Sequence, residues 1–412
     1  MTPAVTIGMP LYNNAGTLAR AIASIKGQTF QDWRLIATDD GSDDESVAVA
    51  KRAANGDPRI ELRENAHRLG HLNFGVSLKA ARSDWFVWLG ADDYWAPRFL
   101  EATLAAAGAH PNAVSVLPRW SYTGSGTGAP RTLPLDGPRT ERVRRFLAAP
   151  GGTRMYGLTR RKVLQAAFPK RSFHAYDWYL VLGLIRQGPQ IEVPKVLLYR
   201  ERTPLRHYVE SAVQENPTAL AAWPVARMSL MALAKGHIPL RGLDALLKLN
   251  LRKHEEHLAY RHPARLARRL GLFKALGLPI SSQPDRTREI AQDLLRNMPD
   301  QRRGAGMVLQ RLMDRGDGAA AYLLGEARLK GVIEGDARTA FARGDALGNG
   351  DAAFALALLD RQAGSLSDTA FWLSVAKLAT LSDRAARHLE DARRAGVLPP
   401  VVAAVERFRT AS

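Results

Sequence analysis

The chain has 412 residues, of which 46% are apolar and 24% are charged, and its formal net charge is +18. This composition is typical of globular proteins, and the length predicts two or three domains. The absence of cysteine excludes disulfides, thiolate metal sites and a cysteine nucleophile. We find neither an apolar run long enough for a transmembrane helix nor a signal-peptide pattern, so we expect a cytoplasmic protein.

The first 120 residues alternate between strand-like and helix-like patterns. Leu18, Ile22 and Ile25 share one face of the first helix, whose N-cap is Asn13 or Asn14. We expect strands over 5–9, 33–38, 60–62, 85–89 and 114–117, and further helices over 46–54, 72–81 and 97–107. Strands that alternate with helices predict an α/β fold, with a mostly parallel sheet and helices on both faces.

Three of the expected strands end on polar residues. The first runs into Tyr12-Asn13-Asn14, the second ends on Asp39-Asp40, and the fourth ends on Asp92-Asp93. Ligands of such sheets bind beyond the carboxyl ends of the strands, so we expect these residues to meet at one edge. Paired aspartates repel each other, and a hard cation such as Mg²⁺ or Mn²⁺ would neutralise them. For one Asp-Asp pair alone, a solvated turn before a helix is the commoner explanation.

The region after residue 120 contains a loop, helices and two short strands. Residues 121–139 are rich in Gly, Pro, Ser and Thr, which predicts a long loop. We expect helices over 159–166 and 177–186, and strands over 191–193 and 196–199. Asp177 starts one of these helices, where it is either a base that accepts a proton from a hydroxyl or a helix cap.

A nucleotide-diphosphate sugar is a ligand that suits the side chains at the strand ends. Asp93, with Asp92 beside it, would hold a divalent metal ion on the diphosphate and stabilise the charge that develops on the leaving group. Tyr12 offers a ring for base stacking, Asp40 offers an acceptor for a base N–H, and Asp39 would serve the ribose or the loop.

Three segments resemble family 2 glycosyltransferases. The family's opening strand, Pro-x-Tyr-Asn turn and Asp-Asp-Gly-Ser strand end are similar to VTIGMPLYNNAGTLARAIASIKGQTFQDWRLIATDDGSDD. Its metal-binding strand is similar to WFVWLGADDYWAPRFLE, and its acceptor-side segment is similar to MYGLTRRKVLQAAFPKRSFHAYDWYLVLGLIRQG. The resemblance covers about residues 3 to 205 and rests on several motifs in the expected order.

The resemblance implies a GT-A fold, which is the Rossmann-like fold of nucleotide-diphospho-sugar transferases. It implies an inverting displacement from a UDP-sugar donor, with Mn²⁺ or Mg²⁺, to a saccharide or lipid-linked hydroxyl acceptor in bacterial polysaccharide or glycoconjugate synthesis. Asp177 is the expected general base, and the expected metal ligands are Asp92 and Asp93. The expected nucleotide-sugar residues are Pro10, Tyr12, Asn14, Asp39, Asp40, Arg68, Asn73 and Asp92.

Two positions depart from the family pattern. Gly90 replaces the first carboxylate of an Asp-Ala-Asp-Asp motif, and Tyr176 replaces the Glu of a Glu-Asp pair at the base. These departures keep an alternative open, namely a catalytically silent scaffold that retains the fold and binds a partner.

The rest of the chain is helical in pattern. Residues 206–285 read as basic amphipathic helices, and residues 286–412 are rich in Ala with a repeat of 32 residues that starts at Gly318 and Gly350. The expected domains are therefore 1–205, 206–285 and 286–412. The last of these weakly resembles Sel1-like repeats, which bind partner proteins, and a plain helical extension or a dimer contact is the alternative.

The positive charge predicts anionic partners. We find no nucleic-acid-binding motif and expect no nucleic-acid partner. The basic helices between about 225 and 280 either lie on an anionic membrane surface or present a solvated face.

Overall fold

The computed structural model describes residues 2–123, 134–201, 222–275, 284–400 and 402. The chain forms two compact units, Met1–Asn250 and Leu251–Ser412. The expected domain boundary at residue 205 lies outside the described residues. The division into three domains therefore stays a prediction.

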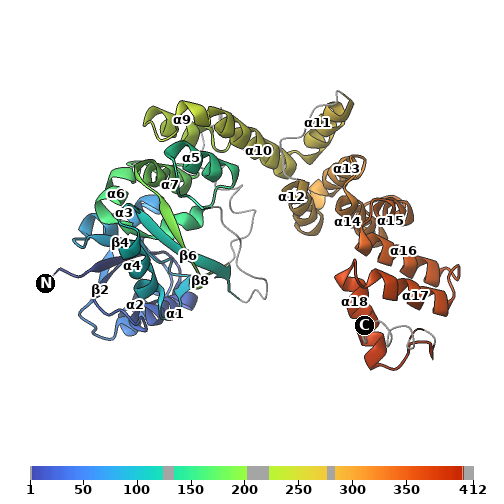
Figure 1. Ribbon diagram of the computed structural model, residues 1–412, viewed down its shortest axis with the longest axis horizontal. Coiled ribbons are helices and arrows are strands. Elements are labelled where there is room, and N and C mark those ends of the chain that lie inside the picture. The colour runs from blue at the N-terminus through green and yellow to red at the C-terminus, as the bar shows by residue number, and fades with distance from the viewer. Residues whose placement is uncertain (1, 124–133, 202–221, 276–283, 401, 403–412) are drawn as a thin grey trace. The chain divides into compact units, whose positions relative to one another are not determined.

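A single sheet organises the first unit (Figure 1). Its strands are β1 (Val5–Leu11), β2 (Trp33–Asp39), β3 (Ile60–Glu64), β4 (Trp85–Trp88), β5 (Tyr94–Trp95), β6 (Ser115–Tyr122), β7 (Leu158–Arg160) and β8 (Gln190–Arg200). They lie in the order β3-β2-β1-β4-β7-β6-β8-β5. The β3-β2-β1-β4 half is parallel, and β6 and β8 are also parallel. In the other half, β7 and β5 pair antiparallel with their neighbours, so the sheet as a whole is mixed. The expectation of a mostly parallel sheet is therefore wrong for the half β7-β6-β8-β5.

Helices cover both faces of the sheet, as expected. They are α1 (Ala15–Lys26), α2 (Ser46–Ala54), α3 (Asn73–Ala80), α4 (Phe99–Ala109), α5 (Arg139–Ala148), α6 (Arg161–Ala167), α7 (Tyr176–Gln187) and α9 (Ala226–Ala234), with 3₁₀ turns η1 (Gly70–Leu72), η2 (Gly152–Tyr156) and η4 (Leu240–Gly242). Right-handed crossovers put α1 and α2, which pack together, on one face. α3 returns the chain from β3 to β4 and packs on β1 and β2 from the other face.

The apolar periodicity located most of these elements, and the exceptions have local causes. The strand β7 replaces the start of the helix expected over 159–166, because Leu158 and Thr159 bridge β6 and β4. The two strands expected over 191–199 form one strand, β8, which passes through Pro194 with a shift in register against β6. No pattern in the sequence predicted the two-residue strand β5.

The described part of the second unit is entirely helical, as expected. Its helices are α11 (Pro263–Ala275), α12 (Pro284–Asn297), α13 (Arg302–Met313), α14 (Gly318–Leu329), α15 (Ala337–Ala346), α16 (Gly350–Gln362), α17 (Asp368–Leu378) and α18 (Asp383–Arg394), with the turn η5 (Pro299–Gln301). The helix α10 (Leu243–Arg261) spans the boundary of the two units. An α/β unit followed by an all-α region is therefore confirmed.

The repeat of 32 residues coincides with helix starts. Asp317 caps α14 by accepting from Ala320 N at 3.0 Å, and Asn349 caps α16 by accepting from Ala352 N at 2.9 Å. Small residues let successive helices approach, since a Cβ on Gly325 would lie 2.5 Å from the ring of Phe341. The resemblance to Sel1-like repeats stays a prediction.

Candidate active site at the carboxyl ends of β1, β2 and β4

The sheet brings the three polar strand ends together. Leu11 of β1 pairs with Asp39 of β2, and Gly8 pairs with Trp88 of β4, so these three strands end at one edge. The chain leaves β1 toward β2 and later returns on its other side as β4, which makes the gap between β1 and β4 a topological switch point. Thr17 of α1 spans this point and donates to the carbonyl of Ala91 at 2.9 Å.

The two aspartates that end β2 are buried and hold loops. Asp39 accepts hydrogen bonds from the backbone N–H groups of Gly41 and Ser42, both at 3.1 Å, and so closes its own turn. Asp40 accepts from Leu69 N at 2.7 Å and from Gly70 N at 2.8 Å, across to the loop before α3. Both carboxylates therefore shape the edge at which a ligand would lie.

Tyr12 and Arg68 lie together although they are distant in the sequence. The Arg68 guanidinium sits over the Tyr12 ring, 3.9 Å from its centroid, in a cation–π contact. Asn14 folds back, and its side chain accepts from Tyr12 N at 2.9 Å instead of capping α1. The edge thus presents a half-buried aromatic ring with an exposed arginine above it.

Pro10 and Asn73 belong to the frame of this edge. Pro10 pairs in register with Thr38 of β2. Asn73 is buried, donates to the Thr38 carbonyl at 2.8 Å and accepts from Asn65 Nδ2 at 3.0 Å, and Asn65 also donates to Asp40 at 3.0 Å. In the structure, Asn73 therefore acts through Asn65 to position the loop that Asp40 holds.

The two carboxylates of the Gly90-Ala91-Asp92-Asp93 turn differ in burial and in hydrogen bonding. A Cβ on Gly90 would lie 2.7 Å from Asp92 Oδ1 and 3.2 Å from Asp93 Oδ2, so a third carboxylate at position 90 would displace both. Asp93 is 1% exposed, and its two oxygens accept from Arg200 Nε and from Glu201 N, both at 3.0 Å. Asp92 is half-buried, and within the described ranges nothing donates to its carboxylate.

Burial controls the protonation of Asp93. The pKa of Asp93 is raised to about 6, mainly because the group is removed from water; the charge of Arg200 opposes this increase, and the negative charge of Asp92 adds to it. A carboxylate with this pKa changes its charge near neutrality.

Asp177 lies in the first turn of α7, not at its cap. The N-cap position is Ala175, which has a left-handed conformation with φ of 61°. Asp177 Oδ1 accepts from Trp178 N at 2.9 Å, and Gly152 of η2 lies so close that a Cβ there would overlap Asp177 Oδ2. Burial raises the pKa of Asp177, whereas the charges of His71 and Arg200 act in the opposite direction.

Arg200 at the end of β8 joins these carboxylates and was missed as a site residue from the sequence. Besides the ion pair with Asp93, it donates to Thr153 Oγ1 at 2.7 Å and lies 4.9 Å from the centroid of the Tyr156 ring. The pKa of Tyr156 is raised, mainly by burial, and the charges of Arg200, Asp93, Asp92 and Asp177 all reach it. The candidate base and the paired aspartates are therefore grouped around one arginine and one tyrosine.

His71 and Gly152 are further neighbours of Asp177 that sequence reasoning missed. The His71 ring stacks on Tyr176 with the centroids 4.2 Å apart. The only sequence signal for Gly152 is the Gly151-Gly152 pair before the acceptor-side segment, and that pair alone indicates no more than a turn.

No preformed metal cage is present in the described part of the chain, where no group of three or more acidic or histidine side chains could hold an ion. The fit to a metal ion therefore depends on Asp92, the carboxylate without a described donor. Mg²⁺ in phosphate-transfer sites is often held by one or two carboxylates, with substrate phosphates and water as its other ligands. Asp92 fits that pattern, with Asp93 beside it but engaged by Arg200.

Comparison with known proteins agrees with this geometry. Residues 6–168 match the model of the glycosyl transferase family 2. EpsE of Bacillus subtilis, named as a glycosyltransferase, is 36% identical over 105 residues, which are 25% of this chain and 38% of that protein. A glycosyltransferase of Haemophilus influenzae is 32% identical over 103 residues, 25% of this chain and 41% of that protein. The matches thus span well under half of these relatives.

Solved structures give more distant likenesses. Residues 1–349 of Staphylococcus aureus TarS, in complex with UDP-GlcNAc, are 14% identical with a TM-score of 0.49, over 80% of this chain and 92% of that one. The mannosyltransferase PcManGT of Pyrobaculum calidifontis, in complex with GDP-Man and Mn²⁺, is 19% identical with a TM-score of 0.44, over 67% and 81%. Likeness at this level does not indicate which ligand this chain binds.

Residues 6–168 of the α/β unit thus match the family 2 glycosyltransferases that the sequence motifs indicated. The sheet with helices on both faces is the α/β architecture expected with that match.

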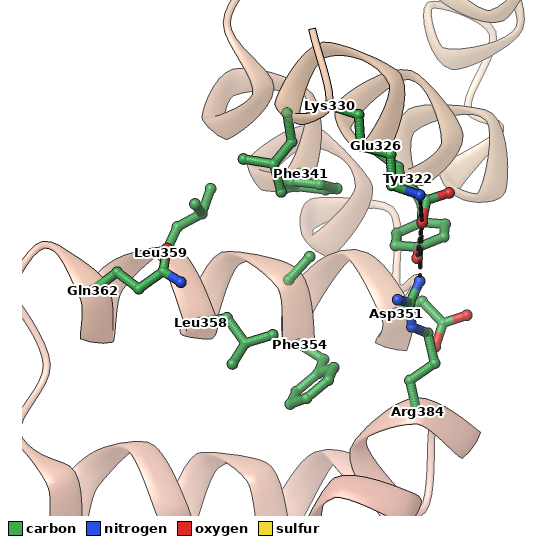
Figure 2. A pocket seen from close by; sticks show the side chains of 12 residues that line it. Tyr322, Glu326, Lys330, Phe341, Asp351, Phe354, Leu358, Leu359, Gln362 and Arg384 are labelled. Atoms are coloured by element: carbon green, nitrogen blue, oxygen red, sulfur yellow. Dashed lines mark hydrogen bonds and ion pairs between the residues drawn. The ribbon is translucent and has the colours of Figure 1, made fainter. Parts of the chain in front are cut away.

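A hollow lies in the helical unit (Figure 2). Its volume is about 180 Å³, and its lining combines apolar side chains such as Phe341 and Phe354 with polar ones such as Gln362. At its rim, Arg384 of α18 lies 5.4 Å from the centroid of the Tyr322 ring and pairs with Glu326 at 3.4 Å.

Among the residues that the structure describes, none of the helices combines the length and the apolar character that a membrane crossing needs.

Proposed function

We propose that the α/β unit is an inverting glycosyltransferase that moves a sugar from a nucleotide-diphosphate donor to a hydroxyl acceptor. The grouping of Asp92, Asp93 and Asp177 around Arg200 at the carboxyl edge of the sheet carries this proposal. An inverting transfer needs a charged site for the departing diphosphate and a base on the opposite side of the sugar, and this group offers both.

Asp177 is the proposed general base. Its oxygen takes the proton of the acceptor hydroxyl while that oxygen bonds to the anomeric carbon and the bond to the diphosphate breaks. Burial raises the pKa of this carboxyl toward the working pH, which strengthens it as a base, while the charges of His71 and Arg200 favour its ionised form. The hydrogen bond from Trp178 N fixes its orientation.

The other strand ends form the proposed donor side. Tyr12 and Arg68 stack at 3.9 Å and offer planar groups to a nucleobase. Asp40 lies in the loop beside them and keeps an acceptor lone pair for a base N–H, while Asp39 and Asn14 hold the turns that shape this part of the edge. UDP is the proposed nucleotide because the resemblance of the motifs implies it.

A divalent ion, Mn²⁺ or Mg²⁺, is the proposed cofactor. Bound to Asp92 and the donor diphosphate, it would supply Lewis-acid stabilisation of the leaving group. Among the described residues, Asp92 is the carboxylate of the Gly90–Asp93 turn that accepts no hydrogen bond, whereas Asp93 is engaged by Arg200. Because one carboxylate alone binds a divalent ion weakly, we expect the ion to bind together with the nucleotide.

The test is a transfer assay over a panel of UDP-sugars with Asp177→Asn. Removal of the base is expected to slow transfer by about 10²- to 10⁴-fold while UDP affinity stays unchanged. Asp84→Asn is the matched control, because Asp84 is exposed and precedes β4 at the opposite edge of the sheet. Equal rates for wild type and Asp177→Asn would exclude Asp177 as the base. Absence of both transfer and nucleotide binding would favour the silent scaffold.

The remaining partners stay proposals. The sequence motifs lead us to expect a saccharide or lipid-linked acceptor. The helical pattern of residues 286–412 leads us to expect a protein partner or a second copy of the chain at the C-terminal helices. Peripheral contact with an anionic membrane is also proposed, because Leu240, Leu243 and Leu247 are exposed at successive turns beside Lys248. Failure to float with anionic liposomes would exclude the membrane contact.

A further inference from the structure

A second and strongly basic pocket lies in the helical unit, at the junction of α10, α11, η5 and α13. Its volume is about 570 Å³, which is in the range of pockets that bind small molecules. Four arginines line it: Arg261, Arg265, Arg268 and Arg303. The acidic side chain in its lining is Asp300. Neither the family match nor the transferase proposal uses this pocket, since residues 6–168 lie in the other unit.

The backbone brings these arginines together. Gly304 in the first turn of α13 packs on the first turn of α11, where a Cβ would lie 2.6 Å from Pro263 Cγ and 3.1 Å from Ala264 N. Glycine is thus required for this approach. The contact brings Arg303 and Arg265 into the lining of one pocket, although their helices are separated in the sequence by α12.

Carboxylates do not neutralise this group as they do elsewhere in the unit. Arg288 pairs with Asp317, Arg338 with Asp360, and Arg361 with Asp368. By contrast, Arg261, Arg265 and Arg303 pair with no carboxylate among the residues that the structure describes.

The remaining polar contacts are consistent with an uncompensated positive charge. Within the described residues, the Arg268 side chain donates from Nε to the carbonyl of Ala264 in its own helix, at the long distance of 3.5 Å. The pKa of His262 in the pocket lining is lowered, by partial removal from water and by the charges of Arg265 and Arg261. These two arginines thus disfavour a further positive charge at His262, and a bound anion would offset that repulsion.

We propose that this pocket binds a phosphate or diphosphate group through Arg265, Arg303 and their two arginine neighbours. Guanidinium groups form paired, charge-assisted hydrogen bonds with phosphate oxygens, and several of them around one concave site favour a multiply charged oxyanion over a carboxylate. The group is carried either by a soluble phosphate compound or by an anionic lipid headgroup. The proposal does not depend on the transferase activity of the other unit.

The first experiment is a calorimetric titration of pyrophosphate into the full chain, with chelator present to remove divalent ions. The double variant Arg265→Gln, Arg303→Gln is expected to bind pyrophosphate about 100-fold more weakly than wild type. The reason is that each of the two lost charge-assisted contacts should weaken binding about tenfold. The control is Arg343→Gln, Arg387→Gln, which removes the same charge from exposed positions of the same unit outside the pocket. This control is expected to bind like wild type.

A second experiment separates the two sources of the phosphate. Wild type and both double variants are floated with phosphatidylcholine vesicles with and without phosphatidylglycerol. If only the pocket variant loses flotation with the anionic vesicles, the source is a headgroup. If flotation does not depend on the pocket while pyrophosphate binding does, the source is a soluble phosphate compound. If neither measurement distinguishes the pocket variant from its control, the proposal is overturned. UDP titration in the presence of Mn²⁺ into the same variants reports on the other unit, so a failure there is recognised separately.

Discussion

The α/β unit and the helical unit use charge in different ways. In the α/β unit, Asp93 and Arg200 are 107 positions apart and meet through the order of strands, and a third carboxylate, Asp177, arrives from α7. In the helical unit, helix caps such as Asp317 and Asn349 act on residues three positions away, and ion pairs such as that of Arg288 with Asp317 connect one helix to another. The α/β unit thus gathers several charged groups into one electrostatic environment, whereas the helical unit uses caps and ion pairs to hold its helices together.

The largest expected effect on stability in either unit comes from the protonation of Asp93 in the α/β unit. Its pKa in the folded protein, about 6, is above the ordinary value of 3.8, so its protonated form is favoured by folding. Its contribution to the free energy of unfolding is therefore complete below pH 4 and is lost as the pH rises toward 6, by a total on the order of 3 kcal/mol. Urea unfolding of wild type and Asp93→Asn between pH 4 and 7 measures this.

The expected result for Asp93 is a difference between the two curves. The stability of wild type relative to Asp93→Asn should fall as the pH rises through that window and then level off. Parallel stability curves would show that the burial of Asp93 and its pairing with Arg200 do not set its pKa.

A smaller effect is expected at Gly152. A Cβ there overlaps Asp177 Oδ2, so Gly152→Ala should displace the base, slow transfer and lower the free energy of unfolding by about 1–3 kcal/mol. Gly151→Ala is the matched control, because its Cβ would meet nothing within 4 Å and its φ of −146° suits any residue. Transfer rates and urea unfolding measure both effects, and equal behaviour of the two variants would contradict the close contact.

The smallest effect is expected in the helical unit. Asn349→Ala removes the acceptor for Ala352 N at the start of α16 and should cost about 1 kcal/mol. Asn349→Asp keeps an acceptor at that position and should retain most of the stability. Transfer by the α/β unit should be unchanged in both variants. A loss of stability in Asn349→Asp as large as that in Asn349→Ala would show that the cap is not responsible.

The sequence predicted those features that depend on neighbours along the chain. The alternation of strands and helices over the first 120 residues indicated that Tyr12, Asp40 and Asp92 would reach one edge, and they do. The apolar spacing of α1, α2 and α7 and the repeated helix starts in the helical unit were equally visible. Such features follow from periodicity and from the direction of parallel strands.

The features that the sequence did not predict depend on tertiary pairing. An arginine at the end of β8 has no local sign that its partner is Asp93, and Gly152 has none that it lies against Asp177. The three residues of β7 were too few to show a period, and the bridge to β6 and β4 decides their conformation. Asp39 is a further example. The sequence could not show whether this aspartate holds a turn or binds a ribose, and in the structure it accepts hydrogen bonds from Gly41 and Ser42 of its own turn.

The most direct test of the proposed donor site is a calorimetric titration of UDP into the protein, with Mn²⁺ and with chelator, repeated for Asp92→Asn. Asp84→Asn again serves as the control. If the ion binds between Asp92 and the diphosphate, UDP should bind wild type and the control at least about tenfold more tightly with Mn²⁺, and Asp92→Asn should lose that difference. Equal UDP affinity with and without Mn²⁺, or a difference that persists in Asp92→Asn, would contradict the proposed metal-diphosphate site.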